Sequence, residues 1–193
     1  MAIDLFETLY AEHRFINQVL GAFESYAEAV EAGRPFERHE LNRFVFFLSQ
    51  YAELGHHHKE EHVLIPALVG SGFAAPGGPL EFIRDQHRHE RRLMRRLRRT
   101  AAQKEPWGAE HRKEVVATVR ELVQFERTHM EKENTLLFPE AIRHLHGEPR
   151  QRASQQLLEM QVAWDEDGYA AWLRELGEEL IADHPRARAG AAG

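Results

Sequence analysis

The sequence repeats one helical motif that carries both histidine and glutamate. Residues 56–66 read HHHKEEHVLIP and residues 129–139 read HMEKENTLLFP, and His, Lys, Glu, Leu and Pro coincide without a gap. Upstream, LYAEHRFINQVL (9–20) aligns with IRDQHRHERRLM (83–94), which matches a His-Arg pair in each. The chain therefore consists of two helical hairpins of similar plan. In each, a histidine on the first helix is followed by a His-x-x-x-Glu on the second.

Hydrophobic periodicity is helical throughout, and no stretch alternates apolar and polar residues like a strand. We expect four long helices at about residues 4–31, 38–69, 80–104 and 106–146, then two shorter ones at 153–164 and 168–182. Asp4 is the expected N-cap of the first helix and Pro106 the opening residue of the fourth. The short connections predict an antiparallel four-helix bundle. The expected packing residues of the C-terminal helices are Trp164, Tyr169, Trp172 and Leu176.

Composition excludes several classes of protein. The absence of cysteine excludes disulfides, iron–sulfur clusters and a cysteine nucleophile. No apolar run is long enough to span a membrane, and the acidic, amphipathic start is unlike a secretory signal, so we expect a cytoplasmic protein. The net charge of −6 argues against nucleic acid as a partner, and the arginine-rich residues 84–99 are interpreted as a solvated helix face. Thirteen histidines are unusual.

The histidines and glutamates of the repeat lie on the apolar stripes of their helices. Residues four apart share a helix face, so His56 lies over Glu60 and His129 over Glu133. Both pairs continue an apolar stripe, and His13 and His87 occupy stripe positions on the other two helices. Polar residues therefore interrupt the predicted core at matched depth on every helix.

Burying four imidazoles and two carboxylates together is costly unless cations compensate. The candidate metal ligands are His13, His56, Glu60, His87, His129 and Glu133. Six donors exceed what one tetrahedral zinc accepts, and carboxylates beside imidazoles favour iron or manganese. We expect two ions bridged by Glu60 and Glu133, one taking His13 and His56 and the other the remaining histidines. About four protein ligands per ion leave positions for water, hydroxide, oxo or a small molecule.

Neighbouring residues offer alternative pairs four apart, His57 with Glu61 and His58 with His62. The repeat favours His56 and Glu60, because each glutamate then stands six residues before a proline. His57 lies about 100° further round an α-helix, so we expect it behind the ligands or at the surface. The remaining histidines are expected at the surface: His39, His89, His111, His144, His146 and His184.

This arrangement resembles the hemerythrin-like (HHE cation-binding) family over residues 1–147. The residues that carry the resemblance are His13 in E-H-R, His56, Glu60 and Pro66 in H-x-x-x-E-E…P, His87 in Q-H-R, and His129, Glu133, Phe138 and Pro139 in H-x-x-x-E…F-P. It implies an all-α, up-down-up-down four-helix bundle, followed at residues 148–193 by a C-terminal helical extension with a frayed tail. It also implies two non-haem iron ions, bridged by oxo, hydroxo or water, that bind or process dioxygen or related small oxidants.

One position departs from the family's oxygen carriers, which place a fifth histidine four residues after the histidine of the third helix. Arg91 stands there, and a guanidinium does not ligate metals. The resemblance therefore implies an oxidative-stress or redox role, with dioxygen, peroxide or nitric oxide as the small-molecule partner, rather than oxygen transport. The alternatives are an iron- or oxygen-sensing or storage module without turnover, and a helical interaction domain with a structural metal.

Overall fold

The computed structural model describes residues 4–34, 38–73, 78–104 and 108–186. Every regular element in these ranges is a helix, and none is long and apolar enough to cross a membrane. In chain order the elements are α1 (Leu5–Glu31), α2 (Arg38–Phe47), η1 (Leu48–His57), η2 (Glu60–Leu64), α3 (Ile65–Gly70), α4 (Pro79–Ala102), α5 (Ala109–Lys132), η3 (Glu133–Leu137), α6 (Phe138–His144), α7 (Gly147–Trp164), η4 (Glu166–Gly168) and α8 (Tyr169–Asp183).

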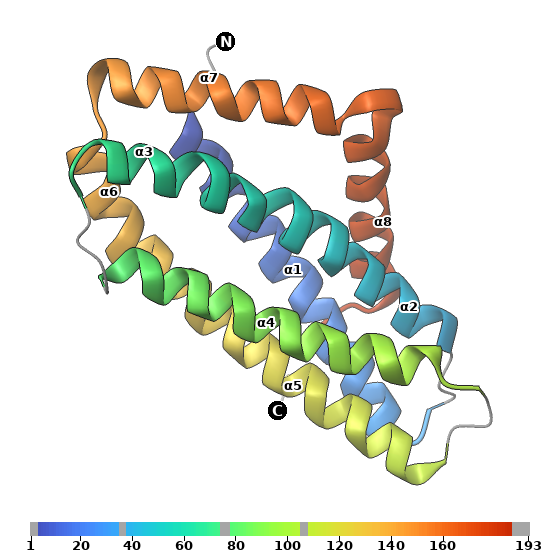
Figure 1. The fold of residues 1–193 in the computed structure, drawn as a ribbon. Coiled ribbons are helices and arrows are strands. Elements are labelled where there is room, and N and C mark those ends of the chain that lie inside the picture. The colour runs from blue at the N-terminus through green and yellow to red at the C-terminus, as the bar shows by residue number, and fades with distance from the viewer. Residues whose placement is uncertain (1–3, 35–37, 74–77, 105–107, 187–193) are drawn as a thin grey trace, which may run out of the picture.

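These elements form four long rods, as the sequence predicts. The rods are α1, the continuous run from α2 to α3, α4, and the continuous run from α5 to α6 (Figure 1). The up-down-up-down bundle is therefore confirmed. Helix α7 crosses one end of the bundle, and α8 turns back to pack against α1 and α2 (Figure 1).

The helix ends follow their local chemistry. Asp4 is the N-cap of α1, and its carboxylate accepts hydrogen bonds from the backbone N–H groups of Phe6 and Glu7. Gly147 begins α7 with a φ of 57°, a left-handed conformation that glycine adopts without a steric cost. Pro106 lies outside the described residues, as do Pro35, part of the 70–79 loop and the tail from residue 187.

Three segments of the long rods have π-helical rather than α-helical hydrogen bonding, namely η1, η2 and η3. Sequence periodicity did not predict them. A π turn closes an i→i+5 hydrogen bond, is rare, and occurs frequently at functional sites. These segments carry His56, His57, Glu60 and Glu133, so the departures from α geometry coincide with the polar positions of the repeat.

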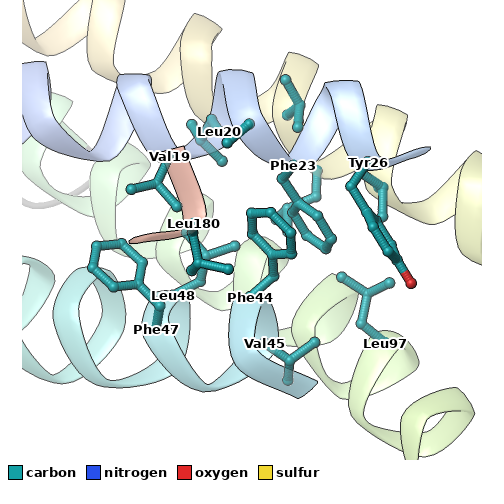
Figure 2. Packing of buried hydrophobic residues seen from close by; sticks show 14 of the residues in the cluster. Val19, Leu20, Phe23, Tyr26, Phe44, Val45, Phe47, Leu48, Leu97 and Leu180 are labelled. Atoms are coloured by element: carbon teal, nitrogen blue, oxygen red, sulfur yellow. The ribbon is translucent and has the colours of Figure 1, made fainter. Parts of the chain in front are cut away.

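A polar layer divides the hydrophobic core into two clusters. The larger cluster contains Phe23, which stacks on Phe44 with ring centroids 4.5 Å apart, together with Leu97 and Leu180 (Figure 2). The smaller cluster lies toward α7 and includes Leu64, Phe138 and Leu157. Along each rod, the candidate histidines and glutamates fall between the stretches that supply the two clusters. The bundle therefore has apolar packing at both ends and ionisable groups in the middle.

The C-terminal helices contribute to both clusters. Leu173 and Leu180 of α8 join the larger one, and Ala153 and Leu157 of α7 the smaller one. Sequence analysis did not single out these four. Three of the packing residues that sequence analysis predicted, Trp164, Tyr169 and Leu176, pack against the larger cluster. Trp172 is 48% exposed, with its ring 5.6 Å from that of Phe46.

Close packing of α8 depends on Gly177. A Cβ atom there would lie 2.6 Å from Phe15 and 2.7 Å from Phe47, whereas one at Gly70 would meet nothing within 4 Å. We expect Gly177→Ala to lower the free energy of unfolding by about 1–3 kcal/mol through overpacking. Gly70→Ala is the matched control and should change it little. Chemical denaturation measures both, and equal stability of the two variants would contradict this account of α8 docking.

Candidate metal centre

The structure brings all six candidate ligands into the polar layer. Each rod supplies at least one, and each is at most 3% exposed: His13 on α1, His56 on η1, Glu60 on η2, His87 on α4, His129 on α5 and Glu133 on η3. Residues that are far apart in sequence thus meet at one depth of the bundle, as the two-hairpin repeat predicts.

The donors fall into two groups, in each of which one ligand atom per residue lies within 4.8 Å of the others. We call His13, His56, Glu60 and Glu133 the first donor group. The second donor group is His57, Glu60, His87 and His129. The expected pairings of His13 with His56 and of His87 with His129 both appear in these groups.

The two buried glutamates face imidazoles of both groups. Glu60 Oε1 is 3.6 Å from His56 Nε2, and Glu60 Oε2 is 3.2 Å from His87 Nε2. Glu133 Oε2 is 3.3 Å from His13 Nε2, and Glu133 Oε1 is 3.4 Å from His129 Nε2. Ligands about 2.1 Å from a shared ion lie roughly 3.0–3.4 Å from each other, close to these separations. The carboxylates are therefore placed to bridge two ions.

Each of four histidines is held by a hydrogen bond on its outer nitrogen. His13 Nδ1 lies 2.8 Å from Asn134 Oδ1 and His87 Nδ1 2.8 Å from Glu61 Oε1. His56 Nδ1 lies 2.9 Å from Glu12 Oε2, and His129 Nδ1 lies 2.8 Å from Gln86 Oε1. Such partners fix the ring and leave Nε2 free to ligate.

These outer contacts follow the sequence repeat. Glu12 and Gln86 each precede the histidine of a first helix, and Glu61 and Asn134 each follow the glutamate of a second helix. In every case the histidine and its partner lie on different helices, and each contact in one half of the repeat has a counterpart in the other half.

The inner atoms of the site have no hydrogen-bond partner. This holds for Nε2 of His13, His56, His87 and His129 and for both carboxylate oxygens of Glu60 and Glu133. A buried polar atom without a partner costs free energy, and here eight converge. Imidazole nitrogens and carboxylates together are the donors that divalent iron, manganese and zinc accept, so the residues fit a metal centre.

Burial sets the protonation of the site. It lowers the pKa of His56 and His129 well below the ordinary value, which leaves their lone pairs available at neutral pH. Burial, together with the neighbouring Glu60, raises the pKa of Glu133 well above the usual range. Burial also disfavours charge on His87, but the neighbouring carboxylates of Glu60 and Glu61 outweigh it and raise that pKa to about 10. A cation among these groups would take over the role of such protons.

His57 lies inside the bundle and not at the surface, which was one of its two expected places. It is 1% exposed, so it does not lie at the surface, and it belongs to the second donor group. Its ring stacks on that of His87 with centroids 4.1 Å apart. The expectation rested on α-helical geometry, but His57 ends a π-helical segment. The wider π turn brings two consecutive histidines into the polar layer.

His58, His62, Glu61 and Arg91 lie outside the donor groups. His58 and His62 are exposed, with ring centroids 4.0 Å apart. Glu61 accepts hydrogen bonds from His87 and, at 2.7 Å, from Arg91, so it acts behind the ligands. Arg91 also lies 3.5 Å from Glu53 on the neighbouring rod and stays clear of the centre.

Sequence reasoning missed four further buried ionisable residues. Lys59 donates a hydrogen bond to Glu12, the carboxylate that holds His56. Glu90 and Glu126 are at most 3% exposed, and Glu90 Oε2 is 2.8 Å from His57 Nδ1. Position on the apolar stripe could have found three of them, because Glu12, Glu90 and Glu126 each stand three or four residues from core positions.

A groove of about 650 Å³ reaches the first donor group from the surface. It runs between α1 and α5, and His13 and Asn134 are among its lining residues. The rest of its wall is largely polar, with arginines from α1, α5 and the C-terminal end. The groove borders His13, which is itself 3% exposed.

A comparison with protein families matches the Hemerythrin HHE cation binding domain over residues 4–141 and again over residues 78–187. The first match spans most of the chain and includes all the donors described above. The chain belongs to this family of cation-binding bundles. Searches of curated proteins and of solved structures gave no significant match.

If His57 is a ligand of the second ion, its removal should weaken that ion and leave the first one unaffected. We expect His57→Ala to bind one divalent ion per chain with unchanged affinity and the other at least about tenfold more weakly. His58→Ala alters the next residue, which is exposed, and is the matched control. Calorimetric titration with a divalent metal measures both. Two ions bound equally well by both variants would contradict a ligand role for His57.

The glutamates should matter to both ions. We expect Glu60→Ala or Glu133→Ala to weaken the binding of two ions, because each carboxylate faces both groups, whereas His13→Ala should weaken one. Metal analysis after dialysis against a weak chelator reports the retained ions per chain. Two retained ions in either glutamate variant would contradict the bridging assignment.

Proposed function

We propose that the protein holds two non-haem iron ions, bridged by oxo, hydroxo or water, and uses them to bind or react with dioxygen, peroxide or nitric oxide. The observation that carries this proposal is the convergence of buried, partnerless imidazole and carboxylate atoms from all four rods. Membership of a cation-binding family supports it. The mixed nitrogen and carboxylate donors, with two bridging positions, support the choice of iron in this proposal.

The two ions would have unequal ligand sets. The first donor group offers two histidines and two glutamates, whereas the second offers three histidines and Glu60, with Glu133 Oε1 3.4 Å from His129 Nε2. The first ion therefore keeps more positions for an incoming ligand. The expectation of two nearly equivalent ions assumed that the fifth histidine was missing. His57 supplies a fifth imidazole from another helix, so Arg91 no longer argues against reversible binding.

The chain's own residues set the conditions for this chemistry. Bound iron supplies the electrons with which dioxygen, peroxide or nitric oxide is bound or reduced. The apolar clusters on both sides keep bulk water from the polar layer. The groove at His13 admits a small molecule on the side of the ion with fewer protein ligands. A cytoplasmic location and a role in redox or oxidative-stress chemistry remain part of the proposal.

A sensing module without turnover is the second candidate, and the C-terminal extension favours it. Trp164 of α7 lies over Lys59, with Nζ 5.5 Å from the ring centroid. Lys59 contacts Glu12, which holds His56 Nδ1. A change in the position of His56 would therefore reach α7 through three contacts, His56–Glu12, Glu12–Lys59 and Lys59–Trp164.

Metal should stabilise the folded chain, because it binds donors that only the folded bundle brings together. At an ion concentration about one hundredfold above the dissociation constant, binding contributes roughly 2.7 kcal/mol, or about 5–10 °C in Tm for a chain of this size. Calorimetry with and without a strong chelator measures the difference. An unchanged transition would contradict a site inside the core.

Reaction with oxidants tests the function. We expect protein loaded with about two irons per chain to absorb in the near ultraviolet when oxidised, and to be oxidised by peroxide faster than free ferrous iron. His13→Ala changes the ion beside the groove and should slow this oxidation, whereas His58→Ala should not. Stopped-flow absorption measures the rates. Iron that binds but is oxidised no faster than in buffer would favour the sensing module.

A further inference from the structure

Beside the second donor group lies a smaller cluster of buried ionisable residues, His57, Glu90 and Glu126, which we call the lateral cluster. One ligand atom from each lies within 4.8 Å of the others, and all three residues are buried. None of the three is among the residues that the sequence repeat predicts to be ligands. His57 links the lateral cluster to the second donor group, because an imidazole has two nitrogens on different edges.

The lateral cluster has donor atoms without a hydrogen-bond partner among the residues that the structure describes. His57 Nδ1, Glu90 Oε2 and Glu126 Oε1 are buried and have no hydrogen-bond partner. His57 Nδ1 and Glu90 Oε2 are 2.8 Å apart, but they are not aligned as a hydrogen bond. Their separation is close to the roughly 3 Å between adjacent ligands of an octahedral ion at about 2.1 Å.

Charge in the lateral cluster is unbalanced. The charges that act on Glu126 are those of other carboxylates, Glu90, Glu133 and Glu60. Its counterpart in the sequence repeat is Glu53, which lies 2.9 Å from Arg98 and 3.5 Å from Arg91. Glu53 is thus neutralised by arginines, whereas Glu126 is turned into the core. Two buried carboxylates side by side need a cation or a shared proton.

The lateral cluster also marks where the repeat breaks. His57 aligns with Met130 and Glu90 aligns with Ile16, so at both positions one half of the chain is apolar and the other ionisable. These two residues contact each other. His57 and Glu90 thus replace apolar residues of the other half and meet in the core. This indicates that they have a local role that the other half of the bundle lacks.

We propose that His57, Glu90 and Glu126 form a third divalent-cation site, adjacent to the second ion of the proposed centre. One nitrogen and two carboxylates suit a ferrous or manganous ion, with remaining positions for water. The site extends the proposed function, because His57 would serve both the lateral cluster and the second donor group. Ligation through both ring nitrogens requires an imidazolate, so His57 would release its ring proton to solvent when both cations bind. A cation there replaces the proton that two adjacent carboxyl groups would otherwise share.

Anaerobic titration with Mn²⁺ tests the stoichiometry. We expect three equivalents for the wild-type chain and two for Glu126→Gln, which keeps the side-chain shape but removes the charge. Glu114→Gln, an exposed change on the same helix α5, is the matched control and should retain three. Two equivalents in both the wild type and Glu126→Gln would overturn the proposal in favour of a shared proton.

Anomalous diffraction from Mn²⁺-soaked wild-type crystals needs no variant to fold. A peak bounded by His57, Glu90 and Glu126 is expected, in addition to peaks at the two donor groups. Peaks at the donor groups alone would overturn the third site and leave the proposed centre standing. A peak at the lateral cluster alone would support the third site and overturn the centre, and no peak at all would overturn both.

Discussion

The structure depends on a layer of ionisable side chains buried at the middle of a hydrophobic bundle. Imidazoles and carboxylates from four rods converge there with their inner atoms unpaired. Such a layer is strongly destabilising unless cations occupy it, and the apolar clusters above and below hold the rods together across it. Stability and function are therefore linked. The residues that cost the fold most are the ones that can bind metal.

Much of this arrangement could be predicted from the sequence. The repeat and the four-residue spacing placed His13, Glu60 and Glu133 on inward faces, and the structure brings them together. The repeat also carries the outer hydrogen bonds, since Glu12 corresponds to Gln86 and Glu61 to Asn134. The two hairpins therefore share the residues that hydrogen-bond the candidate ligands as well as the ligands themselves.

The rest could not be predicted, because it depends on local departures from α geometry. A helical-wheel argument turns His57 away from His56 by about 100°, whereas a π-helical segment carries both into the core. Glu90 and Glu126 stand at stripe positions, but a stripe position does not reveal whether a neighbouring rod supplies a partner. The positions of these side chains depend on packing between helices, and the periodicity of a single helix does not predict that packing.

The N-terminal cap of α1 has a consequence for how the chain folds. Asp4 lies 2.8 Å from Arg150, and the backbone N–H of Leu5 donates a hydrogen bond to Ser154. Helix α8 then packs along α1 as well. The first helix therefore completes its contacts only after almost the whole chain has been synthesised. A topology with such long-range closure raises contact order, so formation of the finished bundle should be slower than for four helices joined only to their neighbours.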